Sequence, residues 1–108
     1  MRPELIAHRL ALLGREDYLQ LLSNFERDYP KYMAELSTSQ TLRNGLHSLK
    51  GMSYAAGFEE VGNKIADIEH MLHNGASVTV RIHLKSIAPA IEDALHQTKA
   101  YLAKIANE

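Results

Sequence analysis

Apolar residues recur every three or four positions along most of this 108-residue chain, which is the spacing of an amphipathic helix. The pattern predicts helices from about Pro3 to Leu12, Arg15 to Leu36, Ser39 to a stop at Gly57, Phe58 to His73, and Thr79 to Ala106. Ser39 fits an N-cap, and Gly14 and Asn74-Gly75 end the helices before them. Four long amphipathic helices with short connections predict an all-α fold, an antiparallel up-down four-helix bundle with a short additional N-terminal helix.

Three signals interrupt this pattern. Pro30 lies inside the second apolar stripe, and because the stripe continues beyond it we expect a bend. Pro89 lies inside the last stripe and is expected to be internal to one long helix. Asn44-Gly45 is a turn signal, but the stripe passes through it in phase, so the helix is expected to continue. Gly45 and Gly62 would allow neighbouring helices to approach closely.

Composition limits the class of protein. The length suits a single domain over residues 1–108, and a 45% hydrophobic content is ordinary for a globular chain. A net charge of −1 without a basic stripe does not favour nucleic acid. The chain has no cysteine, which excludes disulfides and thiolate zinc sites and fits a cytoplasmic location. No apolar run is long enough to span a bilayer, so no direct membrane insertion is expected.

The third predicted helix carries the candidate chemistry. If Leu42 is set at zero on a helical wheel, the buried side is formed by Leu42, Leu46, Leu49, Ser53 and Ala56. His47 then lies at about 140°, with Arg43 and Lys50 at about 100° and 80°. We therefore expect an exposed imidazole with two cations beside it, one of them, Lys50, one turn further along.

Gly51 lies at about 180° on the same wheel. A glycine inside a helix costs about 1 kcal/mol relative to alanine, and packing does not explain that cost on an exposed face. The gap would let the backbone of a partner approach His47. Tyr54, further along this face, is expected to be a docking contact, although packing back onto the bundle stays open. Gly57 is expected to be a structural helix stop.

The segment His47-Ser48-Leu49-Lys50-Gly51, together with Gly57, the pair Ile68-Glu69 and the Leu13-Gly14 opening, resembles the histidine-containing phosphotransfer (HPt) domain over nearly the whole chain. Such domains are helical bundles that accept a phosphoryl group from the aspartyl phosphate of one receiver domain and pass it to another. The resemblance implies that His47 is the phospho-acceptor, that Lys50 supports the phosphate and that Gly51 clears the docking surface. Leu46 departs from the family, which often has a small residue there.

The resemblance also implies the partners. These would be receiver domains of a hybrid sensor histidine kinase, of a response regulator, or of both, and the receiver would supply Mg²⁺. The chain itself would be a monomeric phosphocarrier without a cofactor or autonomous kinase activity, and no Gly-rich nucleotide loop contradicts this. It would work in the cytoplasm, alone or as the C-terminal part of a membrane-anchored hybrid kinase.

Two other functions stay open. A helical adaptor would bind a signalling partner through the same face without phosphorylation of His47. A dimeric bundle, as in the dimerisation region of histidine kinases, is less favoured because this chain has enough helices to close its own core. His70 and His73, with Glu69 beside them, have a spacing that could bind a metal, but HExxH is absent and we expect no metal site.

Overall fold

The computed structural model describes residues 2–75 and 77–107, and residues 77–79 by their backbone only. Every element in these ranges is helical, which confirms the all-α prediction. The helices are α1 (Pro3–Leu13), α2 (Arg15–Glu35), α3 (Leu42–Ala56), α4 (Glu59–His73), α5 (Ser77–Leu84) and α6 (Ile87–Ala106).

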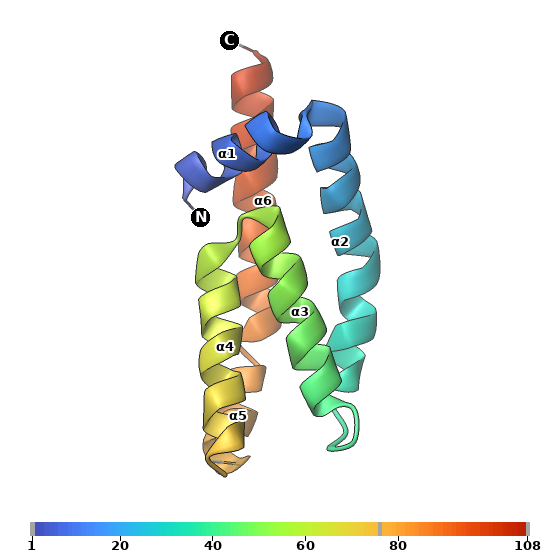
Figure 1. The fold of residues 1–108 in the computed structure, drawn as a ribbon, viewed down its shortest axis with the longest axis vertical. Coiled ribbons are helices and arrows are strands. Elements are labelled where there is room, and N and C mark those ends of the chain that lie inside the picture. The colour runs from blue at the N-terminus through green and yellow to red at the C-terminus, as the bar shows by residue number, and fades with distance from the viewer. Residues whose placement is uncertain (1, 76, 108) are drawn as a thin grey trace.

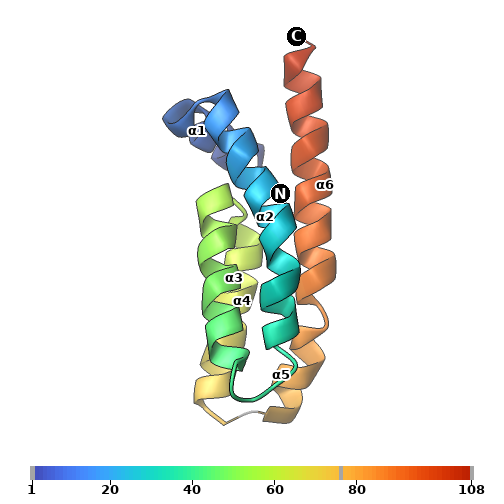
Figure 2. The same ribbon diagram turned by 90° about the vertical axis from the view of Figure 1, so that its right-hand side faces the viewer.

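Four of these helices follow the long axis of an elongated molecule of 49 × 21 × 21 Å. In Figure 1, α2 and α4 run downward while α3 and α6 run upward, so successive long helices alternate in direction. α3 packs between α2 and α4. α1 crosses one end of the molecule and contacts α2 and α6, whereas α5 lies at the other end beside α4 (Figures 1 and 2).

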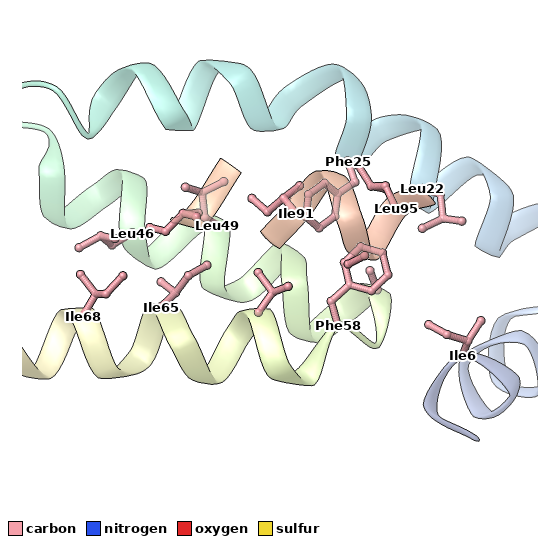
Figure 3. Packing of buried hydrophobic residues seen from close by; sticks show 14 of the residues in the cluster. Ile6, Leu22, Phe25, Leu46, Leu49, Phe58, Ile65, Ile68, Ile91 and Leu95 are labelled. Atoms are coloured by element: carbon pink, nitrogen blue, oxygen red, sulfur yellow. The ribbon is translucent and has the colours of Figure 1, made fainter. Parts of the chain in front are cut away.

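The core lies between the long helices. Leu46 and Leu49 of α3, Ile65 and Ile68 of α4 and Ile91 of α6 are almost completely buried and point toward one another (Figure 3). On α3 the predicted buried side is largely confirmed, because Leu46, Leu49, Ser53 and Ala56 are fully buried and only Leu42 is partly exposed. One face of α3 is therefore fixed toward the interior, and the opposite face is left to solvent.

The predicted start of the third helix at Ser39 is wrong. α3 begins at Leu42, and residues 36–41 form turns. The hydroxyl of Thr41 donates a hydrogen bond to the carbonyl of Glu35 at 2.6 Å and so caps the end of α2. The amide of Leu42 donates to the carbonyl of Thr38 at 3.0 Å. The Ser/Thr-rich segment is used to close the α2–α3 turn, and the helix starts after it.

The prediction of one last helix from Thr79 to Ala106 is also wrong. The chain forms α5 and α6 with a break at residues 85 and 86, and Pro89 lies in the first turn of α6. A proline has no amide to bond the carbonyl four residues back and clashes with it, so a helix is disfavoured across that position. In a first turn the missing donor costs nothing. Ser86 completes the break, because its hydroxyl bonds the carbonyl of His83 at 2.6 Å.

The other two interruptions do not end a helix. α2 continues through Pro30, which is exposed, and the bend expected there stays a prediction. α3 continues through Asn44-Gly45, as predicted. Gly45 is buried, and a Cβ atom on it would lie 2.8 Å from the carbonyl oxygen of Tyr32. The prediction of a close helix approach at Gly45 is confirmed, because α2 and α3 touch there.

The C-terminal end of α3 is held by its own turn and by two other helices. Gly57 has a left-handed conformation at φ 87°, and the amide of Phe58 donates to the carbonyl of Ser53 at 2.8 Å. This is the hydrogen bond of a Schellman motif, so the predicted stop at Gly57 is confirmed. From α2, the hydroxyl of Tyr18 donates to the carbonyl of Ala56 at 2.7 Å. From α1, the guanidinium of Arg9 donates to the carbonyl of Tyr54 at 3.2 Å.

None of the described helices is long and apolar enough to cross a membrane.

Candidate functional site

His47 lies on the solvent-facing side of α3, as predicted. Its side chain is exposed, while its neighbours Leu46 and Leu49 are fully buried on the opposite face. α3 is packed by α2 on one flank and by α4 on the other (Figure 1). The imidazole is therefore presented to solvent from a helix whose backbone is fixed by core packing.

Lys50 lies one turn after His47 but is not a free cation. Its ammonium nitrogen is 2.6 Å from a carboxylate oxygen of Glu69 on α4, and the two side chains are 28% and 27% exposed. The sequence placed Lys50 on the correct side of α3 but did not show its partner, because Glu69 comes from another helix. Sequence reasoning considered Glu69 only beside His70 and His73 and as part of the pair Ile68-Glu69 of the resemblance, and gave it no role next to His47.

Arg43 lies one turn before His47 on the same face and is exposed. Within the described residues it has no ion pair or hydrogen bond to a side chain. The resemblance gave the support of the phosphate to Lys50, but in the structure Arg43 is the less engaged of the two cations. Arg43 is available to an incoming anion, while the charge of Lys50 is already compensated.

Gly51 faces open space. Apart from its chain neighbours and the backbone of its own helix, a Cβ atom added to it would meet no heavy atom within 4 Å. Gly45 and Gly62, in contrast, have neighbours closer than 3 Å at the same position. Packing inside the molecule explains those two glycines and does not explain Gly51. Ala55, one turn further along, is also exposed and small, so the surface beyond His47 carries little side-chain bulk.

Tyr54 packs back onto α4. A Cβ atom on Gly62 would lie 2.5 Å from the ring, so the absence of a side chain at Gly62 makes room for Tyr54. The tyrosine hydroxyl donates to the side-chain oxygen of Asn63 at 2.7 Å. These contacts fix the ring between α3 and α4 and confirm the close helix approach expected at Gly62. They explain Tyr54 by packing, and its expected role in docking stays a prediction.

A groove follows the other flank of α3, between α2 and α3. It has a volume of about 450 Å³, and its apolar lining comes from Leu21, Phe25, Tyr32, Met52 and Ala55. Its polar lining comes from Asp17, Gln20, Asn24 and Asp28. Sequence reasoning missed this groove, because a groove depends on the distance between two helices and not on the pattern within one.

His70 and His73 lie in the last turn of α4. Among the described residues, no three histidine, aspartate or glutamate side chains come together as metal ligands. The ring nitrogen Nε2 of His70 lies 3.2 Å from the side-chain amide of Asn74, and His73 is exposed. The expectation that they bind no metal stays a prediction.

Comparison with known proteins gives no match: no family model, no curated protein and no solved structure is significantly similar to this chain. The residues and their geometry are therefore the basis for the functional proposal.

Proposed function

We propose that this protein is a histidine phosphotransfer intermediary, an HPt-like up-down four-helix bundle in which His47 accepts a phosphoryl group from the aspartate of a receiver domain and passes it to another receiver. The observation that carries the proposal is the placement of His47. Its side chain is exposed on a helix that is fixed by the core. Arg43 lies one turn before it and Lys50 one turn after it, and the surface next to it at Gly51 is unobstructed.

The chemistry asks for a nucleophile, room and nearby positive charge. A neutral imidazole nitrogen attacks the phosphorus, the bond from phosphorus to the aspartate oxygen breaks, and the carboxylate leaves while the other ring nitrogen keeps its proton. The receiver would contribute the aspartate and Mg²⁺. Arg43 would offset the charge of the phosphoryl group, and Lys50 would do so only as far as it leaves its ion pair with Glu69.

The surface around His47 also suits docking of another protein. The absence of a side chain at Gly51 and the small Ala55 allow close approach, and the groove between α2 and α3 offers an apolar surface beside them. Apolar centres with polar rims are typical of protein interfaces, and a transient contact buries less than about 1,200 Å² in total. We propose that the receiver places an apolar side chain in this groove while its aspartyl phosphate faces His47.

The test is phosphotransfer from a labelled receiver. We expect label to appear on this chain as an acid-labile, base-stable adduct, and His47→Gln to abolish it while circular dichroism shows an unchanged helical fold. His73→Gln removes another exposed histidine of the chain and should leave labelling intact. Label that persists in His47→Gln would contradict the proposal.

The same assay separates the adaptor function. An adaptor would bind the receiver without taking up label, and its affinity would be the same for the wild type and for His47→Gln. Binding measured by calorimetry alongside the transfer assay therefore distinguishes a carrier from a docking module.

A further inference from the structure

The Lys50–Glu69 ion pair is unusually shielded for a surface contact. Its two side chains are 28% and 27% exposed, whereas those of Lys99–Glu26 are 56% and 39% exposed. Ion pairs gain strength as water is excluded from around them. The pair joins α3 to α4 on the flank of α3 next to His47, so it lies where a phosphoryl group on the ring would bring its charge.

Phosphorylation of His47 changes the balance at this pair. Before it, the ammonium of Lys50 has one anionic partner, the carboxylate of Glu69. Afterwards a dianionic phosphoryl group is held one helical turn away, within reach of the same ammonium. Glu69 and the phosphoryl group then compete for the ammonium of Lys50. A stronger contact of Lys50 with one of these anions weakens its contact with the other.

We propose that Glu69 is a positioning residue that holds Lys50 away from the phosphoryl group and thereby lowers the stability of phosphohistidine, which keeps the group easy to transfer onward. This inference rests on the proposed role of His47 and extends it. Without Glu69, Lys50 would be free to pair with the phosphoryl group, and the phosphohistidine would last longer before its group is transferred.

The test uses phosphoramidate, a small phosphoryl donor that needs no receiver. The imidazole nitrogen of His47 attacks its phosphorus, the phosphorus–nitrogen bond of the donor breaks and ammonia leaves. The half-life of the phosphohistidine is then followed by ³¹P NMR after the donor is removed. We expect Glu69→Gln, which keeps the shape of the side chain and removes its charge, to lengthen the half-life about fivefold.

A matched control separates this effect from a general change of charge. Glu26→Gln makes the same substitution in the Lys99–Glu26 pair between α2 and α6, and its half-life should equal that of the wild type. Thermal unfolding of each variant checks that the fold is retained, and Glu69→Ser should reproduce the effect of Glu69→Gln. Equal half-lives in the wild type and in both Glu69 variants would overturn the proposal.

The role of Lys50 is tested in a double-mutant cycle. Lys50→Met alone should shorten the half-life, and Glu69→Gln added to Lys50→Met should change it no further, because Glu69 is proposed to act through Lys50. A full fivefold effect of Glu69→Gln without Lys50 would show direct repulsion and overturn the mechanism. A residue that merely supports the fold would alter the melting temperature of the variants but not this pattern of half-lives.

Failure of the relay and failure of this inference give different results. If phosphoramidate loads His47 but no receiver does, the relay function is contradicted while the effect of Glu69 is still measured. If receivers load the chain and Glu69→Gln has no effect on the half-life, the relay stands and this inference falls. A chain that forms no adduct at His47 with phosphoramidate overturns the inference directly.

Discussion

Tyr18 has a completely buried ring whose hydroxyl is hydrogen-bonded to another helix. The hydroxyl donates to the carbonyl of Ala56 at the end of α3, which ties α2 to the helix that carries His47. Burial raises the pKa of Tyr18 to about 12, against the lowering effect of the nearby Arg9. The ordinary tyrosine pKa of about 10 applies to the unfolded chain. Folding therefore favours the protonated ring.

This difference in pKa gives a stability that depends on pH. The contribution of Tyr18 is complete below about pH 10 and is lost as the pH rises from about 10 toward 12, because the unfolded chain then releases its proton first. Tyr18→Phe removes the hydrogen bond and should lower the free energy of unfolding by about 1–2 kcal/mol at pH 8. That deficit should shrink at pH 11, measured by urea unfolding of both proteins.

A second tyrosine provides the control for this prediction. Tyr101→Phe, at a half-buried position on α6, should keep the pH dependence of the wild type. A deficit for Tyr18→Phe that is the same at pH 8 and pH 11 would show that burial of the Tyr18 hydroxyl does not shift its titration.

At the scale of single residues, the sequence predicted which side chains of α3 face solvent. It did not predict which residues of other helices contact them. The 3.6-residue period of the apolar positions was enough to place His47 and Gly51 on the exposed side of α3, and the structure agrees. The pairing of Lys50 with Glu69, and of Tyr54 with Gly62 and Asn63, depends on the rotation of α4 relative to α3. That rotation follows from core packing, which a helical period does not describe.

At the scale of the element, two glycines of α3 should respond to the same substitution in opposite ways. Gly45→Ala would place a methyl group 2.8 Å from the carbonyl oxygen of Tyr32 and 3.0 Å from Glu35 and Leu36, so α2 and α3 must separate. We expect a loss of about 1–3 kcal/mol. Gly51→Ala meets open space and should raise the free energy of unfolding by about 0.5–1 kcal/mol.

Chemical denaturation of the two alanine variants side by side measures this difference. A lower free energy of unfolding for Gly51→Ala would mean that a side chain at position 51 does not point into open space. If Gly51→Ala is more stable than the wild type and also transfers phosphoryl groups more slowly, the glycine gives a partner access to His47 and lowers the stability of the helix.

The ends of the elements were harder to predict than their existence. Pro30 and Pro89 give the same signal in the sequence, yet α2 continues through one and the chain breaks before the other. The difference lies in the surroundings: Pro89 has Ser86 before it, whose hydroxyl satisfies the end of α5. Similarly, the hydroxyl of Thr41 bonds the end of α2, which delays the start of α3 beyond Ser39.

At the scale of the whole molecule, the shape is longer and narrower than that of an average domain. The radius of gyration is 14.6 Å, compared with about 13 Å for a typical compact domain of this length. A chain with its own closed core needs no second copy, and we expect a monomer. Small-angle X-ray scattering should give a radius of gyration close to 14.6 Å and the mass of one 12.1 kDa chain. Twice that mass across a dilution series would favour the dimeric bundle.

The attachments of α3 at both ends have a consequence for the proposed phosphotransfer. The close contact with α2 at Gly45 opposes rotation of α3 about its axis, and the hydrogen bonds from Tyr18 and Arg9 to its last turn oppose movement along that axis. The backbone that carries the imidazole is thus held in place, and in the proposed function the docking receiver would supply the movement. Specificity for a new partner would then arise from substitutions of exposed side chains on α2, α3 and α4, while the contacts that hold α3 stay unchanged.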